Sequence, residues 1–200
     1  MKKLLLTGFE PFLNHSLNPT ETIAKKLDGS EIGDYRVFGQ VLPVEYSRSA
    51  GELIDYYHEL KPDVVISLGL AAGRNRITPE RVAININDGV KDNRGRIPVD
   101  ERIAEDGPDA YFSTLPIREF ANGLQAKGLP AEISNTAGTY LCNNVMYEML
   151  HEMNTSGADC YAGFIHLPAS HELAMEDKSL PSWSQRDLLE AVRIMIEMLD

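Results

Sequence analysis

Three residues of this sequence, Cys142, His166 and Glu80, have the types and positions that a thiol hydrolase needs. Cys142 stands at the start of a predicted helix, 143–153, after the small-residue stretch 136–139. The unpaired N–H groups and positive dipole end of a helix stabilise a thiolate, and they can also hold the oxyanion that forms when a thiolate attacks a carbonyl. A small buried residue at a turn would explain Cys142 equally well.

The candidate base is His166, which ends the apolar run 160–165 and precedes Leu167-Pro168. This position places an imidazole at the carboxyl end of a strand, where open α/β sheets bind their ligands. There it can serve as general base to a thiol. A strand-end histidine that faces solvent is the alternative.

Glu80 is the candidate partner of the histidine, because it begins a predicted strand over 81–87. The link from Leu70 to Arg81 is too short for an ordinary parallel crossover, so we expect this strand to run antiparallel to its neighbour. Its start then lies near the carboxyl ends of the parallel strands, where a carboxylate can orient an imidazole and stabilise its cation. A surface glutamate beside Arg81 is the other interpretation. These residues predict a Cys–His–Glu hydrolase without naming its substrate.

The elements that must position these residues alternate along the chain. Short runs of apolar residues, or apolar residues that alternate with polar ones, predict strands. Apolar residues that recur every three to four positions predict helices. The predicted strands are 3–7, 36–42, 63–70, 81–87, 132–135 and 160–166. One predicted helix begins at Pro19, after the cap Asn18. The other predicted helices are 46–60, 117–127, 143–153 and 188–199, and Ser184 is the predicted start signal of the last. The stretch 91–108 is predicted to be a loop.

This alternation predicts an α/β fold. We expect a single domain over residues 1–200, built as a three-layer sandwich whose mixed, mostly parallel twisted sheet has helices on both faces. Cys160 lies inside an apolar strand and is expected in the core.

Composition narrows the possible partners. The net charge of −11 repels phosphate backbones and anionic lipid, so we expect no nucleic-acid or membrane partner. The apolar start, Leu4 to Leu6, is interrupted by Thr7, Gly8 and Glu10, too early for a secretory signal. With only two cysteines and no zinc-type spacing, the sequence predicts a cytoplasmic protein with reduced thiols and no bound metal.

At these same residues the sequence resembles the pyroglutamyl peptidase I family, also called pyrrolidone-carboxylate peptidases. The similar segments, spread over nearly the whole chain, are 7–12 (TGFEPF), Asn18-Pro19, 77–85 (ITPERVAIN), 106–108 (DGP), 115–117 (LPI), 134–143 (SNTAGTYLCN) and 163–168 (GFIHLP). The segments that hold Glu80, Cys142 and His166 match the three catalytic positions of the family.

The resemblance implies a cysteine peptidase that removes an N-terminal pyroglutamyl residue from peptides, with no cofactor and with assembly into homodimers or homotetramers. It implies Cys142 as nucleophile, His166 as acid and base, and Glu80 as its orienting partner. It also implies substrate-binding roles for Phe9, Phe12, Tyr140 and Leu141 around the lactam ring. An apolar slot with few polar contacts suits that uncharged ring and rejects glutamate, whose carboxylate is costly to desolvate.

Two positions depart from the family pattern. Leu70 stands where many members carry a Gln that is expected to form a hydrogen bond with the lactam. The segment 88–93 lacks an Arg that is thought to assist the oxyanion in many members, and Lys91 is the residue that could substitute for it. Two alternatives therefore stay open: a thiol hydrolase of the same fold acting on another small amide or lactam, and a non-catalytic binding protein.

Overall fold

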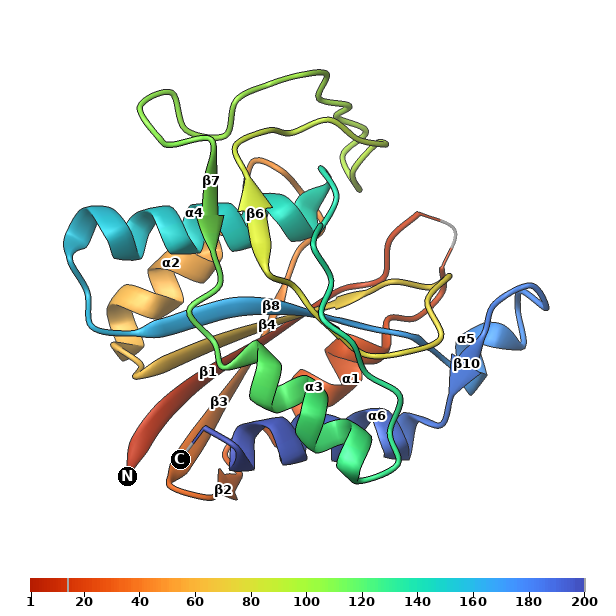
Figure 1. Ribbon diagram of the computed structural model, residues 1–200. Coiled ribbons are helices and arrows are strands. Elements are labelled where there is room, and N and C mark those ends of the chain that lie inside the picture. The colour runs from red at the N-terminus through yellow and green to blue at the C-terminus, as the bar shows by residue number, and fades with distance from the viewer. Residues whose placement is uncertain (14, 200) are drawn as a thin grey trace.

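A twisted sheet of apolar strands lies at the centre of the molecule in the computed structural model, which describes residues 1–13 and 15–199 (Figure 1). Within these residues six strands form the main sheet in the order β2-β3-β1-β4-β8-β5. Their bounds are β1 Lys2–Phe9, β2 Glu31–Ile32, β3 Tyr35–Leu42, β4 Val64–Leu70, β5 Thr78–Pro79 and β8 Tyr161–Leu167. Every residue of β4 is buried, because helices cover both faces of the sheet at that strand.

The sheet is mixed. Strands β3, β1, β4 and β8 run parallel to one another, whereas β2 pairs antiparallel with β3, and β5 pairs antiparallel with β8. The two antiparallel strands are the two edges of the sheet. Pro79 fits the edge strand β5 because a proline has no N–H to donate to a neighbouring strand. The predicted mixed, mostly parallel sheet is confirmed.

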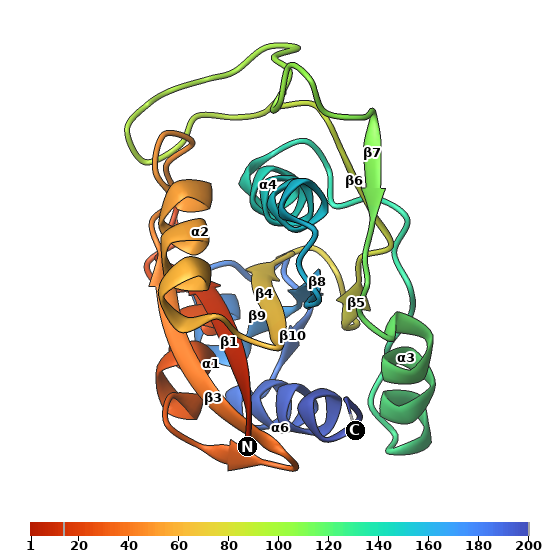
Figure 2. The same ribbon diagram turned by 90° about the vertical axis from the view of Figure 1, so that its left-hand side faces the viewer.

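Helices form a layer on each face of the sheet (Figure 2). One layer holds α2 (Ser49–Leu60) and α4 (Leu141–Ser156), and the other holds α1 (Pro19–Leu27), α3 (Ile117–Ala126) and α6 (Gln185–Glu197). Because side chains alternate along a strand, Leu5 and Val65 pack into the α2–α4 core. Leu4 and Ile66 pack into the opposite core. The predicted three-layer arrangement is confirmed.

The caps that the sequence predicts set the starts of two helices. The side chain of Asn18 accepts a hydrogen bond from Thr20 N, and Pro19 occupies the first turn of α1. The side chain of Ser184 accepts one from Asp187 N at the start of α6. Helix α2 begins at Ser49, three residues later than predicted. No helix of the described residues has both the length and the apolar character that a membrane crossing requires.

The predicted strand 81–87 is wrong in extent and in partner. Only β6 (Val82–Ile84) forms, and it pairs with β7 (Ala110–Phe112) in a separate two-stranded sheet. Beyond Ile84 the polar side chains bond to loops instead of to a strand. Asn85 Oδ1 accepts from the backbone N–H groups of Ile103 and Ala104, at 2.9 Å each. The alternating pattern came from the antiparallel pair β6–β7, which packs against α4, and the strand that runs antiparallel beside β8 is β5.

The predicted strand 132–135 is also wrong, since its segment makes only isolated bridges beside β5, Ile77 with Ala131 and Glu80 with Ser134. Glu132 N donates to Ile77 O, and Ser134 N donates to Pro79 O. Between these bonds a continuous ladder would need an N–H at position 79, which proline lacks. Short elements that sequence patterns do not indicate are β9 (Ala169–Ser170), α5 (His171–Ala174) and β10 (Ser182–Trp183).

Candidate active site

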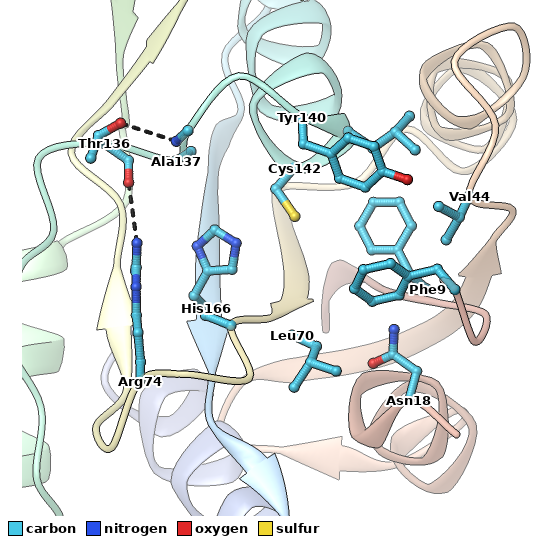
Figure 3. Close-up of a pocket in the computed structure, with 14 residues that line it drawn as sticks. Phe9, Asn18, Val44, Leu70, Arg74, Thr136, Ala137, Tyr140, Cys142 and His166 are labelled. Atoms are coloured by element: carbon cyan, nitrogen blue, oxygen red, sulfur yellow. Dashed lines mark hydrogen bonds between the residues drawn. The ribbon is translucent and has the colours of Figure 1, made fainter. Parts of the chain in front are cut away.

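A cavity of about 290 Å³ opens where β1, β4 and β8 reach their carboxyl ends (Figure 3). Phe9, Leu70 and His166 enter it from those three strands. The other lining residues are Phe12, Asn18, Val44, Ala71, Arg74, Thr136, Ala137, Gly138, Tyr140, Leu141 and Cys142. The crevice that parallel sheets present to ligands is therefore present here, and most of its wall is apolar.

The thiol of Cys142 projects into this cavity from the second residue of α4. Tyr140, the residue before the helix, makes no side-chain hydrogen bond to the first turn. The N–H groups of a first turn have no partner inside the helix, so those of α4 can donate to a group bound beside the sulfur. A Cβ atom built on Gly69 of β4 would lie 3.0 Å from the Cys142 sulfur. The sulfur therefore sits directly over the middle of the sheet.

His166 and Glu80 form a buried pair beside the thiol. His166 Nδ1 lies 2.7 Å from Glu80 Oε1, and the glutamate is completely buried. The short antiparallel pairing of β5 with β8 brings them together, since Thr78 is paired with His166 and Glu80 N donates to Phe164 O. With Nδ1 occupied by the carboxylate, Nε2 is the nitrogen that is free to exchange a proton with the thiol. Figure 3 shows the imidazole and the sulfur facing each other.

The charges of the site favour an imidazolium between two anions. Burial is the largest influence on His166 and lowers its pKa. The charge and hydrogen bond of the Cys142 thiolate, together with those of Glu80, outweigh burial and raise the pKa of His166 to about 9. Burial raises the pKa of Glu80, but the bonds and charge of His166, with Ser134 and Arg74, more than offset it, so that the net pKa of Glu80 is lowered. The arrangement can hold a thiolate–imidazolium pair backed by an ionised carboxylate.

On the far side of the thiol the cavity forms an aromatic slot. The rings of Phe12 and Tyr140 lie 6.3 Å apart between centroids, and Phe9 and Val44 lie in the same wall. Asn18 is the polar group of this slot and is almost fully buried. Its Oδ1 caps α1 and its Nδ2 donates to Glu10 O, which leaves the amide nitrogen a second N–H. The slot suits a small uncharged ring that offers an acceptor.

Comparison with known proteins shows what this arrangement is similar to. A family model described as pyroglutamyl peptidase matches residues 2–200. The chain belongs to the pyroglutamyl peptidase family. A pyrrolidone-carboxylate peptidase of Oceanobacillus iheyensis is 52% identical over 200 residues, the full length of both chains. One from Halalkalibacterium halodurans is 54% identical over 197 residues, 98% of each chain.

Solved structures of the family have the same fold. Pyrrolidone carboxyl peptidase from Thermococcus litoralis matches with a TM-score of 0.95 at 45% identity, covering 100% of this chain and 93% of the other. A crystal structure of a mutant enzyme from P. furiosus matches with the same TM-score at 46% identity, covering 98% and 97%. The resemblance read from the sequence motifs is confirmed at the level of family and fold.

The residues for which the family resemblance implied a role lie at one cavity or directly behind its wall. Phe9, Phe12, Tyr140 and Leu141 line it together with Cys142 and His166. Glu80 does not line the cavity and lies behind the imidazole. Among the described residues, no group of three or more His, Cys, Asp or Glu side chains is arranged to hold a metal ion.

Several lining residues were not indicated by the sequence. Asn18 was predicted as a helix cap and as part of a segment similar to the family, without a role in the site, and Val44 follows a proline at a strand end without any chemical signal. Arg74 lies in the Gly- and Ala-rich link after β4, six residues before Glu80, a separation that reveals no contact. Lys91 is exposed and does not line the cavity, although its backbone oxygen accepts from the Tyr140 hydroxyl at 3.1 Å.

Proposed function

We propose that this protein hydrolyses the amide bond that follows an N-terminal pyroglutamyl residue, with Cys142 as nucleophile, His166 as general acid and base, and Glu80 as the partner that orients His166. The observation that carries the proposal is that the Cys142 thiol and the buried His166–Glu80 pair lie at the edge of a cavity lined mainly by apolar residues. Membership of the pyroglutamyl peptidase family supports the choice of substrate.

Acylation begins with the pyroglutamyl ring in the aromatic slot and its carbonyl carbon above the sulfur. The thiolate attacks that carbon, and the negative charge that moves to the carbonyl oxygen is stabilised by N–H groups at the start of α4. The imidazolium of His166 then gives its Nε2 proton to the leaving amine nitrogen as the C–N bond breaks. The shortened peptide leaves with a free amino terminus, and the pyroglutamyl group remains on Cys142 as a thioester.

Deacylation uses the same groups in reverse. His166, now neutral, takes a proton from a water molecule, and the resulting hydroxide attacks the thioester carbon. The C–S bond breaks, free pyroglutamate departs, and the thiolate–imidazolium pair is restored. Glu80 stays ionised throughout, because its task is to fix the ring orientation and stabilise the cation.

The slot explains why pyroglutamate would be preferred over glutamate. A lactam ring is neutral, so apolar contact with Phe9, Phe12 and Tyr140 stabilises it without leaving a charge unpaired. The second N–H of Asn18, which is not used in the bond to Glu10 O, is the group that we expect to donate to the ring carbonyl. A glutamyl carboxylate would lose its hydration in the same place without gaining a cation, at a cost of several kcal/mol.

A second candidate, a thiol hydrolase that acts on another small amide or lactam, is favoured by one observation. Leu70 is 7% exposed and packs with Ala169 and Leu173 on one side of the cavity. This wall offers no side-chain hydrogen bond where many family members carry an amide, so a ring with fewer polar groups would also fit.

The test is the rate of cleavage of a chromogenic pyroglutamyl anilide, compared with the prolyl and glutamyl anilides. The proposal requires cleavage of the first only, abolished in Cys142→Ser. Cleavage of the prolyl anilide at an equal or higher rate would favour the second candidate.

We further propose that residues 1–200 form one peptidase domain that works in the cytoplasm as a homodimer or homotetramer. Family membership supports the assembly, and light scattering after size exclusion measures it.

A further inference from the structure

Arg74 contacts three separate parts of the site. Its Nη1 donates to Glu80 Oε1 at 2.6 Å and to Thr78 Oγ1 at 2.5 Å, and its Nη2 donates to Thr136 O at 3.3 Å. Thr78 belongs to the edge strand β5, which Glu80 directly follows, and Thr136 belongs to the stretch that leads into α4 and Cys142. The guanidinium lines one end of the cavity, on the other side of His166 from the aromatic slot (Figure 3).

The bond to Glu80 is unusual in using the same oxygen that faces His166. Glu80 Oε1 accepts both from Arg74 Nη1 at 2.6 Å and from His166 Nδ1 at 2.7 Å. Glu80 Oε2 is buried and has no hydrogen-bond partner among the described residues. The two charged groups that help to hold the carboxylate ionised therefore act on one atom, and one of them, Arg74, carries its charge at every working pH.

Charge balance gives this contact a role in the reaction. When the thiolate–imidazolium pair forms, the site contains Cys142 negative, His166 positive, Glu80 negative and Arg74 positive, so the charges alternate and sum to zero. Without the guanidinium, the thiolate, the imidazolium and the Glu80 carboxylate would together carry one net negative charge, and the carboxylate is completely buried. Such a charge is costly in a poorly solvated place, and protonation of Glu80 would relieve it.

We infer that Arg74 is a positioning residue of the catalytic site, which keeps Glu80 ionised and aligned on His166 through the oxygen that the two donors share. This inference rests on the proposed roles of Cys142, His166 and Glu80. The groups that face Glu80 from the surrounding elements are His166 on β8, Ser134 on the segment beside β5, and Arg74 itself on the link after β4.

The expected effect of Arg74→Met follows from the sign of its influence on Glu80. Removing the cation makes Glu80 easier to protonate, and only ionised Glu80 supports the imidazolium. The acid limb of the kcat/KM profile therefore moves to higher pH, and kcat/KM near neutral pH falls by about ten- to hundredfold, the effect that loss of an orienting partner has on metal-bound histidines. Arg74→Lys keeps the charge but loses the planar fork, so its acid limb stays near the natural position while its rate falls less.

Rescue separates this role from a merely structural one. In Arg74→Ala the cavity is open at that end, and millimolar guanidinium chloride is expected to raise kcat/KM severalfold above the same concentration of sodium chloride. Arg76→Met is the matched control, because Arg76 pairs with Glu132 near the surface at 3.0 Å and is half exposed. Its pH profile and its response to guanidinium should equal those of the natural protein.

The rate of alkylation of Cys142 by iodoacetamide, followed against pH, tests the inference without a substrate. Arg74→Met should shift the acid limb of this profile to higher pH as well. An unchanged acid limb in both profiles for Arg74→Met, or lost activity that guanidinium does not restore in Arg74→Ala, would overturn the inference. If the natural protein cleaves no pyroglutamyl amide but the alkylation limb still shifts, the proposed function fails and the role of Arg74 stands.

Discussion

Gly69 and His166 occupy paired positions on the neighbouring parallel strands β4 and β8. A Cβ atom at Gly69 would lie 2.6 Å from a ring carbon of Phe164 and 3.0 Å from the sulfur of Cys142. The absence of a side chain at one position of the pair thus makes room for the thiol beside the imidazole at the other.

Gly69→Ala should therefore damage both packing and chemistry. The added methyl cannot be accommodated without moving the buried Phe164 ring, and overpacking of this kind costs about 1–3 kcal/mol of unfolding free energy. The sulfur must shift as well, so kcat should fall by more than the loss of folded protein explains. Urea denaturation with parallel activity measurements checks this.

Gly51→Ala is the control for that substitution, since Gly51 lies in α2 and no atom lies within 4 Å of its built Cβ. There the same change should raise the free energy of unfolding by about 0.5–1 kcal/mol and leave activity unchanged. Gly69→Ala with natural kcat would show that the sulfur does not depend on this gap.

The two thiols should differ sharply in reactivity. Burial, followed by the charges of Asp63 and Asp159, raises the pKa of Cys160 to about 12, so this residue stays a thiol near neutral pH. Cys142 has an imidazolium beside it and opens into the cavity. Limiting iodoacetamide should label Cys142 first, as peptide mapping by mass spectrometry would show. Earlier labelling of Cys160 would remove Cys142 from the proposed role.

The protonation of His166 should depend on Cys142. With its pKa raised to about 9, His166 of the natural protein is expected to be an imidazolium at pH 8, and the charge of Cys142 is the largest influence that raises this pKa. Cys142→Ser has no anion at that position, so its His166 should titrate at lower pH and be more nearly neutral at pH 8. NMR of labelled imidazole nitrogens measures both titrations, and identical titrations would refute the ion pair.

Leu70→Gln tests which ring the slot prefers. If the new amide reaches the lactam, one neutral hydrogen bond adds about 0.5–1.5 kcal/mol, which corresponds to an increase of roughly three- to tenfold in kcat/KM on a pyroglutamyl anilide. Leu70→Met, of similar volume and without the amide, is the control. A large loss in Leu70→Gln alone would mean that the wall formed with Ala169 and Leu173 has no room for a polar group.

The places of Cys142 and His166 in the fold could be predicted from the sequence because they depend on local patterns. Cys142 follows a small-residue stretch before a helical period, and His166 ends an apolar run, so both lie at the carboxyl edge of the sheet for reasons visible in a few neighbouring residues. The helix start was missed by two residues, which placed Cys142 before α4 when it is in its first turn.

The antiparallel placement of Glu80 was predicted correctly, but for a strand that proved wrong. The antiparallel neighbour of β8 is Thr78–Pro79, which is too short for any periodic signal, and the alternation at 81–87 belongs to the antiparallel pair β6–β7 on α4. Arg74 could not be found from sequence, because its link has no period and its contact with Glu80 arises only when β5 folds back along β8. Charged contacts made by irregular segments leave no local pattern.

The central claim, that Cys142 carries the pyroglutamyl group during turnover, is tested most directly by trapping that intermediate. An activated aryl ester of pyroglutamate should acylate the enzyme faster than water releases it, so an acid quench preserves the thioester. Mass spectrometry of the digested protein should then show one pyroglutamyl group on the peptide that contains Cys142 and none on the Cys160 peptide. Cys142→Ser should hydrolyse pyroglutamyl anilides at no measurable rate. Undiminished hydrolysis by Cys142→Ser, or a pyroglutamyl group found on another residue, would contradict the account.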